Sequence, residues 1–332
     1  MSALLLMDEK PTPNETPMIE VRGLTKRFKK RTAVEDVSFT VGRGKVVGFL
    51  GPNGAGKTTT LRILSCYMPA TSGSAWVGGH DVYTQPDEVR RTIGYLPESN
   101  PLHTDMRVRE YLKFRARLKG MKVADSRRRV DYVTEVCGLG DVQRKLIGQL
   151  SKGYKQRVGL ADSLVHDPEV LILDEPTSGL DPHQIRTVRK LIKELGKTHT
   201  VLLSSHILSE IEMTCDEVII IHKGKIIAAD TVEGLRAKMS SERQVIAEIA
   251  APREELMDYL EHTGEIEHFD VQPSDGDFLM CSLTPRTGLD LRPQVFAVAR
   301  DKGWNLRELT RTRNSLEDIF MRVTRREEED GF

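Results

Sequence analysis

One segment near the N-terminus constrains the fold more than any other part of the sequence. The apolar stretch Lys45–Leu50 is strand-sized and leads directly into a glycine-rich run, after which Thr58–Met68 has the apolar spacing of a helix. The run matches the pattern G-x-x-x-x-G-K-[ST] and consists of Gly51, Pro52, Asn53, Gly54, Ala55, Gly56, Lys57 and Thr58, with Thr59 next. A strand, a tight turn and a helix in this order predict a phosphate-binding P-loop.

The residue types in this loop suit a polyphosphate. Glycines let the backbone turn tightly and bring its N–H groups close to phosphate oxygens, and the following helix points its positive end at the same anion. We expect Lys57 to reach the β- and γ-phosphates of a nucleoside triphosphate, and the Thr58 hydroxyl to bind Mg²⁺. The alternative is a chance glycine-rich turn, which is disfavoured because the flanking strand and helix are both present.

A second buried strand ends in two carboxylates. Val170–Leu173 is followed by Asp174 and Glu175, the Walker B pattern. We expect Asp174 to hold Mg²⁺ through water, and Glu175 to orient the attacking water or accept its proton. An Asp-Glu pair at a helix N-terminus is also favourable without catalysis, but the P-loop favours the catalytic interpretation. His206 follows a further strand, where a histidine is more often structural, and its position makes it a candidate donor to the γ-phosphate.

The order of strands and helices predicts the fold class. Ile19, Val21 and Leu24 suggest a first strand region and 34–41 a second, and buried apolar strands are expected at 45–50, 170–173, 200–203 and 218–221. They alternate with helical segments, which indicates an α/β domain with a largely parallel sheet. We assign this domain to residues 18–235, with a helical subdomain at about 100–165. Residues 1–17 carry three prolines among polar residues, and we expect a flexible N-terminal tail.

The pattern changes after about Gly234. Strand and helix signals then follow in the order β-α-β-β-α-β, which is the ferredoxin-like arrangement. The expected strands are 243–250, 266–271, 278–283 and 306–311, and the expected helices are 252–262 and 289–303. A last helix is expected from Ser315, because apolar residues recur on one helical face from there. We therefore predict a small C-terminal α+β domain over residues 240–332.

Composition excludes several classes of protein. The 49 basic and 49 acidic residues cancel, so no nucleic-acid partner is expected. The four cysteines form no C-x-x-C pair, which argues against a zinc site or a disulfide framework and fits reduced thiols in a cytoplasm. No stretch reaches the ~18 consecutive apolar residues of a membrane helix. The N-terminus lacks the basic region of a signal peptide. Any work at a membrane would then be done as a peripheral subunit.

Taken in order, these motifs resemble the ATPase subunit of an ABC transporter over about residues 18–230. The P-loop and the Walker B strand match the family's order, and His206 matches its switch histidine. The resemblance implies ATP and Mg²⁺ as the ligands. Phe28 lies where the family places an aromatic residue that stacks on adenine. A half-buried strand phenylalanine is the competing interpretation of Phe28.

Two further segments are similar to motifs that the family uses across a dimer. Residues 150–157, L-S-K-G-Y-K-Q-R, resemble the signature motif, which closes over the γ-phosphate of the opposite protomer. This implies that Ser151 and Gly153 contact ATP in trans. Lys and Tyr replace the commoner Gly and Gln in this motif, as is familiar in ABC-2 type ATPases. The run 178–181, S-G-L-D, is similar to the D-loop and implies a trans contact from Asp181.

The resemblance also implies partners. Glu98 stands where most of the family has a glutamine near Mg²⁺ and the attacking water, so we expect Glu98 to lie near the metal and its loop to respond to a membrane partner. Residues 315–320, S-L-E-D-I-F, look like a tail common in ABC-2 type ATPases, which implies an accessory or regulatory C-terminal domain. We therefore expect a homodimer that works with a separate transmembrane permease on the cytoplasmic face of the membrane.

Two alternatives remain open at this point. One is a soluble ABC-type ATPase without a transporter, acting as an assembly or remodelling factor. The other is a nucleotide-dependent scaffold that does not turn over, which Glu175 and His206 disfavour. The sequence does not specify the cargo or the direction of transport.

Overall fold

The computed structural model describes residues 16–238, 244–286 and 289–311. The chain divides into two compact units, residues 1–232 and 233–332, which are described separately. Nearly all of the predicted N-terminal tail, and the helix predicted from Ser315, lie outside the described residues.

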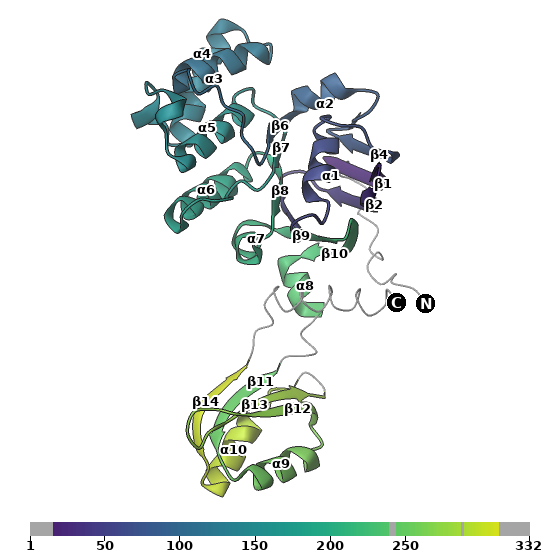
Figure 1. Cartoon of the computed structure of the whole chain (residues 1–332), viewed down its shortest axis with the longest axis vertical. Helices are drawn as coiled ribbons and strands as arrows, with labels where there is room; N and C mark the ends of the chain where they lie inside the picture. The colour runs from purple at the N-terminus through teal and green to yellow at the C-terminus, as the bar shows by residue number, and fades with distance from the viewer. Residues whose placement is uncertain (1–15, 239–243, 287–288, 312–332) are drawn as a thin grey trace. The chain divides into compact units, whose positions relative to one another are not determined.

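The larger unit contains a six-stranded sheet (Figure 1). Its strands lie in the order β10, β9, β3, β8, β7, β6, and every neighbouring pair is parallel except β10 with β9. The bounds are Lys225–Thr231 for β10, Glu217–His222 for β9, Val46–Leu50 for β3, Thr200–Ser205 for β8, Val170–Leu173 for β7 and Ile93–Leu96 for β6. Every residue of β3, β7 and β8 is buried, as expected of strands covered on both faces. The predicted parallel sheet is confirmed.

Helices cover this sheet on both faces. On β3, Val47 and Phe49 share a core with α1 (Lys57–Leu64). Gly48 points the opposite way, where a Cβ would lie 2.7 Å from Ile211 of α7 (Leu208–Thr214). The other helices that flank the sheet are α2 (Pro86–Thr92) and α6 (Pro182–Leu195).

Helix α1 is shorter than predicted. It ends at Leu64 rather than Met68, and Cys66 has a φ of 56°, in the left-handed region that a continuing helix cannot use.

An antiparallel sheet lies beside α1. Two of its strands contain the strand regions predicted at 19–24 and 34–41, but neither their pairing nor the other two strands were predicted. Its strand order is β2, β1, β4, β5. The bounds are Ile19–Phe28 for β1, Arg31–Val41 for β2, Ser72–Val77 for β4 and His80–Asp81 for β5. Residues on one face, such as Ile19 and Val37, join the core that contains Leu61 of α1. The β1–β2 hairpin is thereby fixed next to the helix that follows the P-loop.

The predicted helical region is present as three helices that pack together (Figure 1). They are α3 (Val108–Leu118), α4 (Val123–Val136) and α5 (Lys152–Leu164), with short 3₁₀ turns at Gly140–Val142 and Ile147–Gln149. A polar group links α3 to α5, because Asp162 accepts hydrogen bonds from Tyr111 at 3.1 Å and Arg115 at 2.8 Å. Nearby, the Lys119 Nζ lies 3.0 Å from His166 Nδ1.

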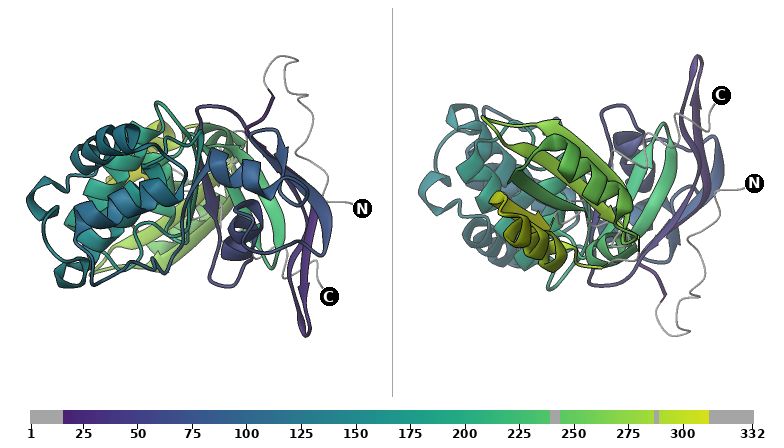
Figure 2. Two further views of the ribbon diagram at one scale, coloured as in Figure 1. Left: turned by 90° about the horizontal axis from the view of Figure 1, so that it is seen from above. Right: turned by 90° about the horizontal axis from the view of Figure 1, so that it is seen from below.

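Helix α8 (Val232–Lys238) starts at the boundary between the units, and the smaller unit contains the element order β-α-β-β-α-β that the sequence predicts. Its four strands form an antiparallel sheet in the order β12, β13, β11, β14. The bounds are Val245–Ala250 for β11, Arg253–His262 for α9, Ile266–Pro273 for β12, Leu279–Pro285 for β13, Arg292–Lys302 for α10 and Asn305–Arg311 for β14. Leu256 of α9 and Val295 of α10 share one core with Ala247 and Leu283, so both helices cover the same face of the sheet (Figure 2).

His166 should make the protein sensitive to mild acid. Burial lowers its pKa from 6.5 to about 4, with a smaller contribution from the Lys119 ammonium, while its Nε2 lies 2.9 Å from the Ile93 carbonyl. Between these two pKa values the unfolded chain binds a proton that the folded chain does not, so stability falls as the pH is lowered through this window. We expect His166→Gln, which keeps a donor and an acceptor but cannot titrate, to reduce the fall in melting temperature between pH 7.5 and pH 5. Equal falls in both proteins would contradict this assignment.

Candidate active site

The P-loop runs from the end of β3 to the start of α1, and two of its glycines are required by close backbone contacts. A Cβ at Gly51 would lie 2.3 Å from the Ile221 carbonyl oxygen, and a Cβ at Gly56 would lie 2.6 Å from the Ala33 carbonyl oxygen. Gly56 also has a φ of 113°, which side chains rarely allow. The loop therefore holds its shape because neighbouring strands leave no room for larger residues.

Lys57, the P-loop lysine, is held inside the loop. Its side chain is 6% exposed. The ammonium donates to the Gly51 carbonyl at 2.7 Å and the Pro52 carbonyl at 3.3 Å, and lies 3.2 Å from Glu175 Oε1. A buried cation with several oxygen partners at the base of a glycine loop can exchange some of them for phosphate oxygens.

Asp174 follows β7 and is fully buried. Its Oδ1 accepts from the Ser204 hydroxyl at 2.7 Å and the Thr58 hydroxyl at 3.2 Å. Its Oδ2 is buried and has no hydrogen-bond partner among the described residues. Burial raises the pKa of this carboxyl, and the nearby Glu98 and Glu175 carboxylates raise it further. A divalent cation at Oδ2 would satisfy the unpaired oxygen and offset the excess of negative charge.

The same residues fit Mg²⁺ better than a metal held by protein side chains alone. Across the part of the chain that the structure describes, no three His, Cys, Asp or Glu side chains gather to hold a metal ion. Mg²⁺ typically takes one or two protein oxygens and completes its octahedron with phosphate oxygens and water. The Thr58 hydroxyl and the Asp174 carboxylate supply that number of oxygens.

Glu175 lies between two potential cations. Its Oε1 faces Lys57, and its Oε2 lies 2.9 Å from His206 Nδ1. Its backbone N–H donates to the Ser204 hydroxyl at 2.9 Å. Its φ is 48°, an unusual value for a residue with a side chain, so surrounding contacts must hold it there. The structure thus brings together the P-loop lysine, the acidic pair and the histidine that the sequence predicted.

Glu98 and Phe28 lie at the margin of this group. Glu98 follows β6, is exposed, and is close enough to Asp174 to raise its pKa. Phe28 ends β1 and is 47% exposed, which fits a half-buried strand residue as well as a ring that stacks on a base. It pairs across the hairpin with Arg31, whose guanidinium donates to the Gly54 carbonyl of the P-loop. Phe28 is therefore next to a P-loop contact, and the Lys26 ammonium lies 5.5 Å from the centre of its ring.

The residues predicted to act in trans lie at the N-termini of two helices, α5 and α6. Ser151 is the N-cap of α5, and its hydroxyl accepts from the Tyr154 N–H at 3.4 Å. A Cβ at Gly153 would lie 2.5 Å from the Gln184 side chain of α6, so this glycine already has a packing reason within one chain. Asp181 is the N-cap of α6 and accepts from the Gln184 N–H at 2.9 Å.

Two residues that the sequence analysis did not assign to the site also contribute to it. Ser204 at the end of β8 bridges the Glu175 backbone and the Asp174 carboxylate. Arg31 holds a P-loop carbonyl. Ser204 could have been found because it lies near the end of the strand before His206, whereas the contact of Arg31 depends on a hairpin pairing that was not predicted.

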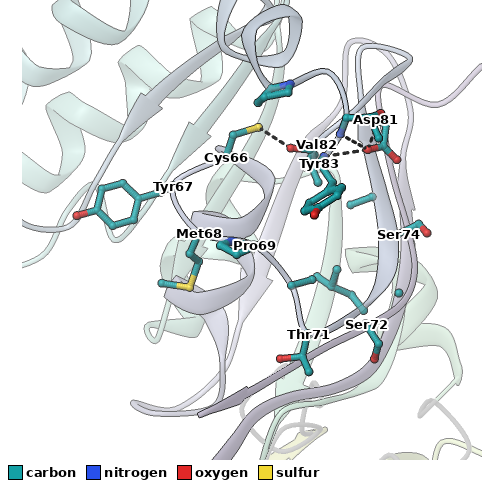
Figure 3. A pocket seen from close by; sticks show the side chains of 16 residues that line it. Cys66, Tyr67, Met68, Pro69, Thr71, Ser72, Ser74, Asp81, Val82 and Tyr83 are labelled. Atoms are coloured by element: carbon teal, nitrogen blue, oxygen red, sulfur yellow. Dashed lines mark hydrogen bonds between the residues drawn. The ribbon is translucent and has the colours of Figure 1, made fainter. Parts of the chain in front are cut away.

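A separate hollow of about 500 Å³ lies beside the end of α1 (Figure 3). It is lined by the segment 66–75 and by residues 81–84, with Leu24 and Pro86. Cys66 Sγ bonds to the Val82 carbonyl on one side, and the exposed ring of Tyr83 lies on another. None of the predicted site residues lines this hollow, so it is distinct from the P-loop site.

Comparisons with known proteins agree with this site. The family model described as ABC transporter matches residues 34–178. The bacitracin transport ATP-binding protein BcrA of Bacillus licheniformis is 34% identical and covers 92% of this chain and 97% of its own length. The ABC transporter ATP-binding protein NatA of Bacillus subtilis is 38% identical over 68% of this chain and 94% of its own. A solved ATP-binding subunit of an ABC transporter has a TM-score of 0.61 and 32% identity, covering 67% of this chain and 92% of that chain.

A P-loop, an acidic pair and a histidine at the carboxyl ends of parallel strands define a P-loop ATPase. With these relatives, the chain belongs to the ATP-binding proteins of ABC transporters. It binds and hydrolyses ATP as the subunit that energises transport, and an ATPase without a transporter is not favoured. Among the described helices, none is both long and apolar enough to cross a membrane.

Substitution of Gly51 should damage nucleotide binding through the backbone. We expect Gly51→Ala to weaken ATP binding by about tenfold or more, because its Cβ would push the loop away from the Ile221 carbonyl at 2.3 Å. Gly42→Ala is the control, since the nearest atom to its Cβ would be 3.7 Å away. A fluorescent-nucleotide titration, with melting temperatures recorded in parallel, measures both. Equal affinity in the two variants would contradict the role of the close contact.

Proposed function

We propose that this chain hydrolyses MgATP as one half of a homodimer that drives a separate permease of the ABC-2 type. The observation that carries the proposal is the placement of Glu175 between Lys57 and His206, beside the unpaired oxygen of Asp174. These groups are what an in-line attack of water on a terminal phosphate requires.

Each residue has a definite task in this mechanism. Lys57 binds the β- and γ-phosphate oxygens, and the P-loop N–H groups with the start of α1 hold the remaining negative charge. Thr58 and Asp174 would hold Mg²⁺, with Glu98 nearby, and a bound metal would supply positive charge next to the phosphate oxygens. Phe28 stacks on adenine at the edge of the P-loop.

Glu175 and His206 act on the water and on the terminal phosphate. When Lys57 turns to the phosphates, Glu175 Oε1 becomes free to accept a proton from the attacking water. His206, bonded to Oε2, fixes the carboxylate and can donate to the γ-phosphate. Loss of that phosphate removes contacts that keep the site closed around the nucleotide.

The second half of the site comes from the other copy. The start of α5 carries Ser151 as an exposed N-cap, and the helix has thirteen residues, so its N-terminus attracts an anion. A second copy facing head to tail would set Ser151 and Gly153 against the γ-phosphate, with Asp181 beside them. ATP then closes the dimer because it contacts both copies.

The membrane partner follows from the relatives. BcrA, a bacitracin transport ATP-binding protein, matches nearly the whole chain, including the smaller unit. We infer that this chain works on the cytoplasmic face of a membrane, bound to a permease through the exposed Glu98 loop. The C-terminal unit then serves the dimer or its regulation.

Replacing the general base tests the proposal. We expect Glu175→Gln to bind ATP while its turnover falls by about 100-fold or more, because the amide cannot accept the proton. Light scattering should show a dimer trapped by MgATP. Glu169→Gln is the control, since it removes an exposed carboxylate that immediately precedes β7. Normal turnover in Glu175→Gln would remove Glu175 from its role.

Co-expression tests the partner. We expect the chain to co-purify with the product of a neighbouring gene that has about six apolar spans of ~20 residues. Glu98→Ala should lower the basal MgATP hydrolysis of the isolated chain, because it removes a carboxylate near the metal, and should also lose stimulation by that permease. A chain that never associates with such a protein, or a Glu98→Ala variant that is stimulated normally, would contradict the partner assignment.

A further inference from the structure

We propose that Glu210 is a positioning residue that fixes the position of Glu175 relative to His206. This inference rests on the proposed roles of those two residues. Glu210 lies on α7, only 6% exposed, and does not belong to any of the motifs described above. Its side chain reaches back to the segments that carry the base and the histidine.

The carboxylate of Glu210 accepts two hydrogen bonds on the same oxygen. The Thr177 hydroxyl donates to Oε2 at 2.6 Å, and the Ser205 hydroxyl lies 3.2 Å from it. Both partners are at most 5% exposed. Thr177 lies two residues after Glu175, and Ser205 lies immediately before His206. One buried carboxylate therefore joins the two segments at the carboxyl ends of β7 and β8.

The bond to Ser205 shapes the chain around His206. The Ile207 N–H donates to the Ser205 hydroxyl oxygen at 3.0 Å. The hydroxyl can therefore donate one hydrogen bond of its own, through its single proton. Two acceptors lie near that proton, the Ile207 carbonyl at 3.4 Å and Glu210 Oε2 at 3.2 Å, and Glu210 is the stronger because it is a carboxylate. With this proton fixed, residues 205–207 form a turn that directs His206 Nδ1 toward Glu175.

The bond to Thr177 steadies the turn that begins at Glu175. The Ser178 N–H donates to the Glu175 carbonyl at 3.0 Å, which closes this turn. The φ of 48° at Glu175 is costly and persists only where neighbouring contacts hold it. Anchoring the Thr177 side chain to Glu210 is one such contact.

Folding alone does not explain a carboxylate at this position. Burying a charge is costly unless it is well paired, and an apolar residue of similar volume is often at least as stable. No ion pair reaches Glu210 from the residues described in the structure, and its partners are neutral hydroxyls. A group that is expensive to bury and that contacts both catalytic segments is better explained by positioning.

The test measures kinetics and stability of the same variants. We expect Glu210→Leu and Thr177→Val to lower kcat by about 10-fold to 100-fold, since small misplacements of catalytic groups have effects of this size. Their KM for ATP should change by less than about threefold, and their melting temperatures should not fall in proportion. Glu210→Gln, which keeps one acceptor oxygen, should recover part of the lost kcat. Thr177→Val keeps the test decisive if Glu210→Leu fails to fold.

Thr214→Val is the matched control. Thr214 is on the same helix, equally buried, and its hydroxyl has no partner within the described chain, so its removal should leave kcat unchanged. Adding Glu210→Leu to Glu175→Gln should produce no further loss, because both act through the same base.

The outcomes separate this inference from the proposed function. If Glu175→Gln is inactive while Glu210→Leu and Thr177→Val keep normal kcat, the role of Glu210 is wrong and the proposed mechanism stands. If the losses of kcat simply follow the falls in melting temperature, the positioning role of Glu210 is also wrong. If Glu175→Gln turns over normally, the proposed mechanism itself fails.

Discussion

The active site depends on burying one ammonium group and two carboxylates together at the carboxyl ends of parallel strands. Lys57, Asp174 and Glu175 are each at most 6% exposed. An unpaired charge at that depth would cost several kcal/mol. The fold offsets this cost by setting Lys57 at 3.2 Å from Glu175 and by giving Asp174 two hydroxyl donors. The strand order that sets β3, β8 and β7 side by side is what makes these pairings possible.

This arrangement links stability to function. Lys57 is already surrounded by oxygens, so a triphosphate can replace the carboxylate without exposing the ammonium to an apolar environment. Asp174 keeps one oxygen without a protein partner, which suits a divalent cation arriving with the nucleotide. Ser204 connects the two acidic residues, and Glu210 ties the segments that follow them. The hydrogen bonds that stabilise the fold around the phosphate-binding loop therefore also orient the catalytic side chains.

Much of the site could be predicted because each part follows a buried strand whose apolar run is visible in the sequence. The P-loop, the acidic pair and His206 all stand directly after such runs. Other features could not be predicted from the sequence. The end of α1 depends on the left-handed conformation of Cys66, which apolar spacing does not reveal. Glu210 bonds to Thr177, 33 residues away, only because β7 and β8 are neighbours. The antiparallel sheet likewise requires β1 to pair with the distant β4, and the Arg31 contact depends on where the β1–β2 hairpin lies relative to the P-loop.

The most direct test of the central claim is a structure of the Glu175→Gln variant with MgATP. We predict two nucleotides in a closed pair of chains, each with its triphosphate wrapped by residues 51–58 of one copy. The Lys57 ammonium should have moved from residue 175 onto phosphate oxygens, and Ser151 of the other copy should face the γ-phosphate. A triphosphate bound away from residues 51–58, or a closed pair in which Ser151 is far from both nucleotides, would contradict the claim.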